Sequence, residues 1–275
     1  MATDDSSQEL KNGRSKALPR SRRPELLYTL ASLAGFFIVW HLSVSAGWVS
    51  EFFLPGPERV FRLMIKMAAD GSLFVHIAVS LARVAGGFLL AVLVAIPLGM
   101  LIGLWRPMFH LVDPWIELVR PIPPIAWIPL AILWLGLGEE SKVAIIMYGA
   151  FFPIILNTIS GFHGVERVHI WAALSLGVSK QKIFWHIILR SALPRIVVGL
   201  RLGAGMAFIV LVAAELILAN SGLGFLIQDG RFQLMTEQIM VGIVTIGILG
   251  YFINKGLLWL ESKWIPYRVT LDQGT

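Results

Sequence analysis

The ionisable side chains inside the long apolar stretches of this 275-residue chain include His41, Arg201 and Glu215. A charge inside a membrane is costly, so such residues usually pair with one another, line a solute pathway or act in a gate. Arg201 and Glu215 are fourteen positions apart, which is about 21 Å along a helix, so they cannot pair directly. We interpret the three residues as candidates for a pathway or a gate.

Each of the three residues also has a structural interpretation. Arg201 follows Pro194 by seven positions, and its long side chain can extend to the cytoplasmic membrane surface. Glu215 lies near the outer end of its stretch, where we expect it to fix helix packing or a gate rather than to bind an anionic substrate. His41 is expected to hydrogen-bond between helices rather than to act as a ligand.

Motifs for other chemistry are absent from the sequence. There is no cysteine, which excludes disulfides, thiolate catalysis and cysteine-ligated metals. The metalloprotease motif His-Glu-x-x-His, the hydrolase motif Gly-x-Ser-x-Gly and the phosphate-binding loop Gly-x-x-x-x-Gly-Lys-Ser/Thr do not occur. We therefore expect no catalytic residue, no metal, no cofactor and no ATP site, so the chain is not expected to be an enzyme.

The composition indicates a membrane protein. Hydrophobic residues make up 56% of the chain, charged residues only 15%, and the mean hydropathy is +0.75, whereas about a quarter of a soluble domain is charged. Six stretches approach the roughly 20 residues that a membrane-spanning helix needs. They run from Leu26 to Ala46, Val84 to Trp105, Ile122 to Leu137, Val143 to Ser160, Ile196 to Ala219 and Ile239 to Trp259. Prolines crowd the start of the third stretch, which is therefore expected to be tilted, bent or partly interfacial.

Basic residues are distributed unevenly between the two sides of these spans. If the N-terminus is inside, fifteen Lys and Arg residues are cytoplasmic, six are outside, and Arg201 and Lys255 fall within spans. Arg120 is counted in the first cytoplasmic loop, and Arg83 and Lys142 are counted outside. The asymmetry follows the positive-inside rule with both termini cytoplasmic. The net charge of +6 therefore reports topology, and no nucleic-acid partner is expected.

The chain divides into three parts. Residues 1–24 are polar and are expected to form a mobile cytoplasmic tail, residues 25–265 form the transmembrane domain, and residues 266–275 form a second cytoplasmic tail. After the first span, Glu58–Ala68 has the periodicity of an amphipathic helix that lies on the outer interface or packs as a connector. Glycines spaced along the spans predict a bundle of closely approaching helices.

A polar segment interrupts the apolar sequence between the fourth and fifth spans, from Gly164 to Pro194. Helix-forming residues precede Gly177, and an amphipathic run follows Ser179. This pattern predicts a helix, a turn that glycine allows and a second short helix. Such a projection can fit into a groove on a partner, although an ordinary amphipathic loop would have a similar sequence.

The segment resembles the cytoplasmic coupling loop of ATP-binding-cassette importer permeases. That loop has the pattern Glu-Ala-Ala, three residues, Gly, nine residues, then Ile-x-Leu-Pro. Five residues match the spacing: Ala172, Ala173, Gly177, Ile187 and Leu189. Two positions differ, because Trp171 replaces the usual Glu and Arg190 replaces the usual Pro, while Leu193-Pro194 supplies a Leu-Pro four residues later.

A second segment, Glu117–Lys142, contains Arg-Pro-Ile-Pro-Pro-Ile-Ala-Trp-Ile-Pro. It is similar to the nitrate, sulfonate and taurine branch of these permeases, and most similar to taurine permeases. The segments Val212–Leu216, Gly222–Phe225 and Arg83–Gly103 share this likeness, which extends over residues 50–260.

The resemblance implies an all-α permease of the type I importer class, with six transmembrane helices and a coupling-helix loop. It implies a location in the bacterial inner membrane, surrounded by lipid. The implied partners are two ATP-binding-cassette ATPase subunits, a second copy of the permease, and a periplasmic or lipid-anchored binding protein. The substrate is expected to be taurine or a related sulfonate; nitrate, a pyrimidine or another small solute are alternatives. An autonomous secondary transporter and a membrane assembly or signalling subunit are alternatives of another class.

The resemblance also assigns roles within residues 164–194. Gly177 is expected to allow the turn, Ala172 and Ala173 to permit close docking on the ATPase, and Lys180 and Lys182 to lie at the rim of the contact. Trp171 is expected to anchor the contact in place of a charge-assisted hydrogen bond from a Glu. Ile187 and Leu189 complete the coupling set.

Overall fold

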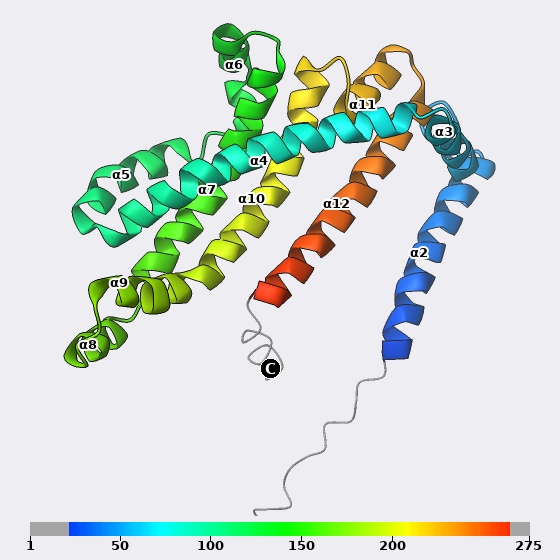
Figure 1. The fold of residues 1–275 in the computed structure, drawn as a ribbon. Coiled ribbons are helices and arrows are strands. Elements are labelled where there is room, and N and C mark those ends of the chain that lie inside the picture. The colour runs from blue at the N-terminus through cyan, green and yellow to red at the C-terminus, as the bar shows by residue number, and fades with distance from the viewer. Residues whose placement is uncertain (1–21, 265–275) are drawn as a thin grey trace, which may run out of the picture. The chain divides into compact units, whose positions relative to one another are not determined.

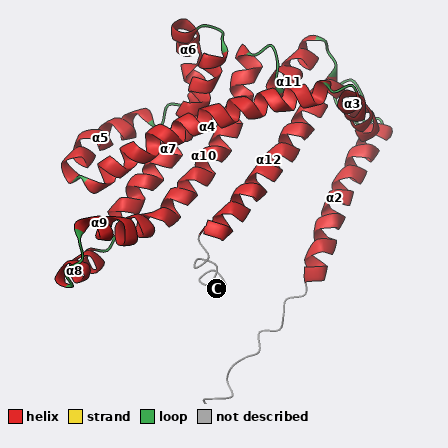
Figure 2. Ribbon diagram, in the orientation of Figure 1, coloured by secondary structure: helices red, strands yellow, loops and turns green. Residues whose placement is uncertain are grey.

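The computed structural model describes residues 22–264, and every regular element in that range is a helix (Figures 1 and 2). In chain order these are α2 (Arg22–Ser45), α3 (Pro57–Ala69), α4 (Ser72–Leu104), α5 (Arg106–Val119), the 3₁₀ turn η1 (Pro124–Trp127), α6 (Ile128–Leu135), α7 (Glu139–His163), α8 (Arg167–Ser175), α9 (Lys180–Ile183), the π-helix η2 (Phe184–Ile188), α10 (Leu189–Leu218), α11 (Leu223–Phe232) and α12 (Thr236–Trp264). The all-α prediction is confirmed. The tail at 266–275 and most of the tail at 1–24 lie outside the described residues.

Four helical segments are long and apolar enough to cross a membrane: α4, α7, the continuous run from α9 to α10, and α12. The α5 and η1–α6 segments pass the same test only as a pair, which is bent by 87°. In α2, the apolar stretch Leu30–Ser45 is shorter than these spans. Counting the bent pair and α2, the arrangement agrees with the predicted six spans.

The chain forms two units, residues 1–57 and 58–275. In the first unit, α2 carries Trp40, whose side chain is buried and whose Nε1–H donates to the Pro55 carbonyl at 3.1 Å. This bond ties the turn after α2 back onto the helix. His41, the next residue of α2, is exposed.

In the second unit, α7 packs against both α4 and α10. Glycines allow this close contact, because a Cβ at Gly87 of α4 or at Gly203 of α10 would lie 2.6 Å from a side-chain carbon of Ile146 or Ile154 in α7. Both isoleucines are fully buried. The predicted tight packing at glycines is confirmed here, in agreement with the role of small residues in membrane helix association.

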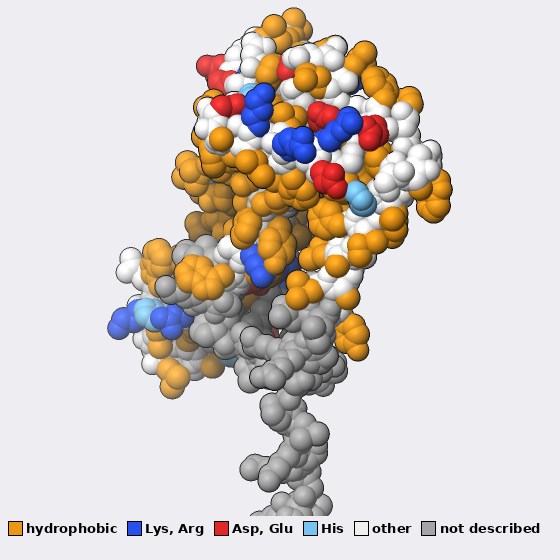
Figure 3. Space-filling view, turned by 90° about the vertical axis from the view of Figure 1, so that its right-hand side faces the viewer, with side chains coloured by type: hydrophobic (Ala, Val, Ile, Leu, Met, Phe, Trp, Pro, Cys, Tyr) orange, Lys and Arg blue, Asp and Glu red, His pale blue; other side chains and the backbone are white. Residues whose placement is uncertain are grey.

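The shorter helix α3 is amphipathic, as predicted. Val60 is buried, whereas Arg62 and Lys66 are exposed. Arg59 Nη1 lies 3.6 Å from an oxygen of Glu237 at the start of α12. Figure 3 shows Lys, Arg, Asp and Glu side chains gathered at one end of the molecule, next to a largely hydrophobic surface.

The third span is bent, as predicted, but it begins earlier than expected. The expected stretch began at Ile122, but the helical pair begins with α5 at Arg106 and continues through η1 and α6. Arg120, which was counted in the first cytoplasmic loop, follows the last residue of α5 and lies at the break of the bent pair. Pro121 has no N–H to donate and disfavours helical backbone at the residue before it, which favours an end of α5 at this position.

Candidate functional site

The polar segment between α7 and α10 forms a projection, which we call the α8–α9 knob (residues 167–183). Gly177 has φ +74°, in the left-handed region that glycine favours. Its N–H donates to Leu174 O, and the Val178 N–H donates to Ala173 O, both at 3.0 Å. These two bonds form a Schellman motif that ends α8. The predicted helix, glycine turn and short helix are confirmed as local structure.

The residues predicted to couple transport to the ATPase differ in exposure. Trp171 is 60% exposed. Also exposed are Ala172, Gly177, Lys180 and Lys182. Ala173 is buried, and Ile187 and Leu189 are half-buried. Five of the eight therefore lie where a partner can touch them, and the other three pack within the chain.

The knob is joined to α10 without a loop. The helix α9 continues through η2 into α10, which gives an uninterrupted helical run from Lys180 to Leu218. Within it, the Leu189 N–H bonds to the carbonyl of Phe184, five residues earlier, as in a π-helix. Arg195, just after this junction, donates from Nη1 to Ser160 O of α7 at 2.8 Å. The knob is thus connected to α10 by continuous helix and to α7 by a hydrogen bond near the junction.

At the other end of these helices, four buried polar side chains and the exposed Glu139 form a network that we call the Arg83 cluster. Its members are Ser80 and Arg83 of α4, Glu139 and Lys142 of α7, and Glu215 of α10. Arg83 binds Glu139 through two hydrogen bonds of 2.6 and 2.7 Å and binds Glu215 at 2.7 Å. Lys142 Nζ donates to Glu139 at 2.8 Å. Two cations and two carboxylates therefore balance.

Backbone groups that lead into α11 complete the cluster. The Gly224 N–H donates to Glu215 Oε2, and the Leu223 N–H donates to the Ser80 hydroxyl, both at 2.8 Å. Arg83 also donates to the Ser221 carbonyl at 2.5 Å. The cluster thus holds α4, α7, α10 and the start of α11 together. Both carboxylate oxygens of Glu215 accept hydrogen bonds and the residue is 1% exposed, so Glu215 is not available to a ligand.

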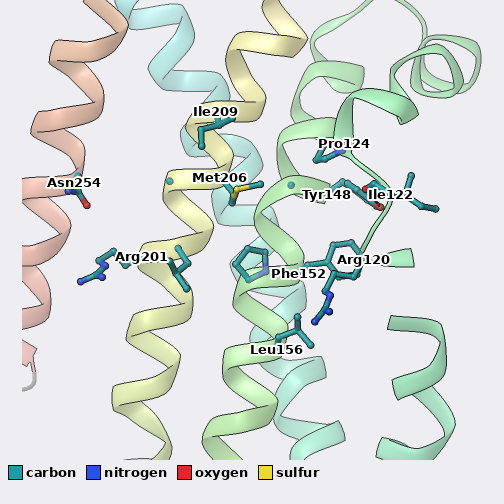
Figure 4. A pocket seen from close by; sticks show the side chains of 14 residues that line it. Arg120, Ile122, Pro124, Tyr148, Phe152, Leu156, Arg201, Met206, Ile209 and Asn254 are labelled. Atoms are coloured by element: carbon teal, nitrogen blue, oxygen red, sulfur yellow. Dashed lines mark hydrogen bonds between the residues drawn. The ribbon is translucent and has the colours of Figure 1, made fainter. Parts of the chain in front are cut away.

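A cavity of about 660 Å³ lies along α10, beside the break in the third span (Figure 4). Its polar lining comes from four elements: Arg120 at the break, Tyr148 of α7, Arg201 of α10 and Asn254 of α12. Most of the rest is apolar, including Phe152 and Met206. We call it the membrane pocket. A mainly apolar cavity with a few convergent polar groups is the usual form of a small-molecule site.

Comparison with known proteins now identifies the chain. Residues 95–260 match the family described as binding-protein-dependent transport system inner membrane component. The chain belongs to this family. It is a multi-pass membrane permease of the ATP-binding-cassette importers.

Individual permeases match over most of their length. The taurine transport system permease protein TauC of Escherichia coli (strain K12) is 38% identical over 255 residues, which cover 91% of this chain and 92% of TauC. The nitrate import permease protein NrtB of Synechocystis is 32% identical over 252 residues, which cover 88% and 90%. A solved structure, described as inward-facing conformations of the MetNI methionine ABC transporter, aligns with TM-score 0.53 at 18% identity. It covers 67% of this chain and 95% of that chain, and it supports the fold.

The three charges predicted for a pathway or gate of the permease are not brought together. Arg201 pairs with Glu261 of α12 at 3.0 Å and lines the membrane pocket, while Glu215 lies in the Arg83 cluster. As expected, these two residues do not pair with each other. His41 is exposed on α2, in the first unit of the permease.

Sequence reasoning missed two features of the permease. Arg83 was assigned to the outer side but is only 4% exposed and joins three helices. The signal was present, because Arg83, Glu139 and Glu215 all fall near the same end of their predicted spans, where opposite charges can meet. Arg120 was placed in a loop because the charges in residues 106–120 concealed the first half of the third span.

Proposed function

We propose that this permease imports taurine or a closely related small sulfonate. The proposal rests on the greater identity to the taurine permease, 38%, than to the nitrate permease, 32%, each across about nine-tenths of this chain. Nitrate, a pyrimidine or another small solute are the competing substrates. A binding protein outside the membrane would deliver the solute and supply most of the selectivity.

The transporter would contain two copies of the permease and two ATPase subunits. Energy would come from those subunits, because the sequence of the permease has no phosphate-binding loop. The family supports an inner-membrane location, and the charge asymmetry supports an orientation with both termini and the α8–α9 knob in the cytoplasm.

The observation that carries the mechanism is the exposed knob at the end of a continuous helical run. Trp171 and Leu176 are 60% and 82% exposed, and aromatic residues on such surfaces often supply much of the binding energy. Lys180 and Lys182 are exposed beside them. We infer that the ATPase groove receives Trp171 and Ala172, with the two lysines at the rim.

ATP-driven closure of the ATPase pair would then move both knobs. Because the run Lys180–Leu218 has no flexible loop, α10 would move with the knob, and α7 would follow through its close contacts with α10. The membrane pocket lies along these two helices. Rigid-body switching of this kind changes access to a site from one side of the membrane to the other.

The direct test is uptake by vesicles that contain the permease, its ATPase and its binding protein. Radiolabelled taurine should accumulate only when the ATPase subunits are supplied with ATP. An excess of an unlabelled small sulfonate should reduce this uptake more than an excess of nitrate or a pyrimidine. Uptake by the permease without an ATPase would contradict the importer and favour a secondary carrier. Preferential competition by nitrate or a pyrimidine would change the substrate but keep the mechanism.

Replacing Gly177 with Val tests the knob. Valine at φ +74° is strained by about 1–3 kcal/mol, so the α8–α9 turn should distort and taurine uptake should fall about tenfold or more. ATP hydrolysis should continue without transport, and membrane insertion should be unchanged. Gly247→Val is the matched control, because a Cβ added at Gly247 of α12 would meet no atom of another element within 4 Å and Gly247 has no positive φ. Normal uptake by Gly177→Val would mean that the knob does not couple.

A further inference from the structure

Arg120 has no partner in the described part of the chain. Its side chain is exposed to the membrane pocket, and no hydrogen bond or ion pair joins its guanidinium to another residue within 22–264. Glu117 precedes it by one helical turn, yet the two do not pair. A cation within a span usually finds a counter-charge or faces a solute pathway, so the absence of the first points to the second.

The position of Arg120 in the bundle is fixed by Tyr148 of α7. The Tyr148 hydroxyl donates to Val119 O at 3.1 Å and to Ile122 O at 3.2 Å. These two carbonyls lie on either side of Arg120-Pro121. Non-helical backbone at membrane depth needs such support. The bond attaches the break of the third span to one turn of α7.

Tyr148 is nine residues from the start of α7 at Glu139 and fifteen from its end at His163. At about 1.5 Å per residue, these separations correspond to about 14 Å and about 23 Å. The backbone of Arg120 is therefore held well inside the span. The guanidinium is too deep to reach either membrane surface easily, unlike a cation at a helix end.

The charge of the pocket is not balanced. Arg201, the other guanidinium in the lining, is paired with Glu261 at 3.0 Å, and none of the residues that line the cavity is an Asp or a Glu. Figure 4 shows Arg120 and Arg201 on different elements, with Phe152 and Met206 between them in the lining. One uncompensated positive charge thus faces a mainly apolar cavity.

We propose that Arg120 is the anion-recognising residue of the solute pathway. The inference rests on the proposed function and assigns the substrate's sulfonate group, or another small oxyanion, to the guanidinium during transit. A planar guanidinium donates two parallel hydrogen bonds to such a group. The apolar wall beside it suits the short carbon chain of an alkanesulfonate. The permease itself therefore selects for an anionic group on the solute, in addition to any selection by the binding protein.

The test uses the complete transporter with Arg120→Gln, which keeps hydrogen-bond donors but removes the charge. Taurine uptake should fall about tenfold or more, since hydrogen bonds to a charged group are about twice as strong as neutral ones. The melting temperature and the ATP hydrolysis stimulated by the loaded binding protein should stay close to wild type. Arg120→Lys should recover much of the uptake. Lys255→Gln is the matched control, because Lys255 lies over the Tyr251 ring in α12 and does not line the pocket.

A second measurement is independent of transport. Radiolabelled taurine should bind to the purified permease in lipid nanodiscs, methanesulfonate should displace it, and Arg120→Gln should abolish that binding. Undiminished uptake and binding in Arg120→Gln would overturn the inference. A large fall in its melting temperature would also overturn it, by showing that the charge is paired structurally with a second copy. If the wild-type transporter shows no ATP-dependent uptake, the proposed function fails, and the binding measurement still decides the role of Arg120.

Discussion

Arg83 and Arg120 belong to consecutive spans of one permease, but their surroundings are opposite. Arg83 is 4% exposed and makes short hydrogen bonds to two carboxylates, Glu139 and Glu215. Arg120 faces a cavity and has no counter-charge among the described residues. The first arginine is neutralised and joins helices, whereas the second keeps its charge available. A cation within a membrane bundle can therefore be assigned to structure or to solute by asking what neutralises it.

The largest effect on stability should come from Arg83→Met. It would leave the fully buried Glu215 carboxylate without a cation, and breaking a buried pair in this way costs about 3–5 kcal/mol. Thermal unfolding of the purified permease in detergent should show the loss. Arg62→Met, at an exposed position of α3, is the control and should change little. A permease as stable as wild type after Arg83→Met would remove the distinction between the two arginines.

A smaller effect is expected from Tyr148→Phe. The change leaves two carbonyls at the break of the third span without their shared donor, which should cost about 1–3 kcal/mol. Because this contact holds Arg120 in place, taurine uptake should also fall, and by more than the loss of folded protein alone would cause. Tyr251→Phe in α12 keeps an aromatic ring under Lys255 and serves as the control. Unchanged uptake by Tyr148→Phe would mean that the break does not need this support to position Arg120.

The smallest effect should come from Arg201→Gln. The pair with Glu261 is partly exposed, because 36% of the Arg201 side chain is accessible to solvent. Pairs of this kind contribute about 0–1 kcal/mol to the free energy of unfolding. Because Glu261 already neutralises Arg201, uptake should change by no more than about twofold. This corresponds to less than about 1 kcal/mol in the activation free energy of transport. A loss as large as that of Arg120→Gln would show that both arginines act on the solute.

The predictable parts of this fold are those set by local sequence. Apolar length predicted the later spans, and Gly177 predicted the turn between α8 and α9. The Arg83 cluster was not predictable in the same way, because Arg83 and Glu215 are 132 positions apart and meet only after α4, α7 and α10 have packed.

The third span shows a different limit. Charged residues within 106–120 lower its hydropathy, and Pro121 interrupts its periodicity, so neither length nor pattern identified α5 as part of a crossing helix pair. The contacts that make the break tolerable come from Tyr148, on a different helix. Hydropathy describes what a segment gains from lipid, but it does not include what a neighbouring helix supplies.

The π-helix η2, between the knob and α10, has a consequence for the direction in which the knob faces. Each residue advances a helix by about 100°. A π-helical turn contains one residue more than an α-helical turn, so it rotates the preceding residues by about 100° relative to α10. The bond from Leu189 to Phe184 provides this shift. The orientation of Trp171 relative to α10 therefore depends on a single residue, and deleting one residue from Phe184–Ile188 would rotate the exposed Trp171 by about that angle while leaving the composition of the knob almost intact.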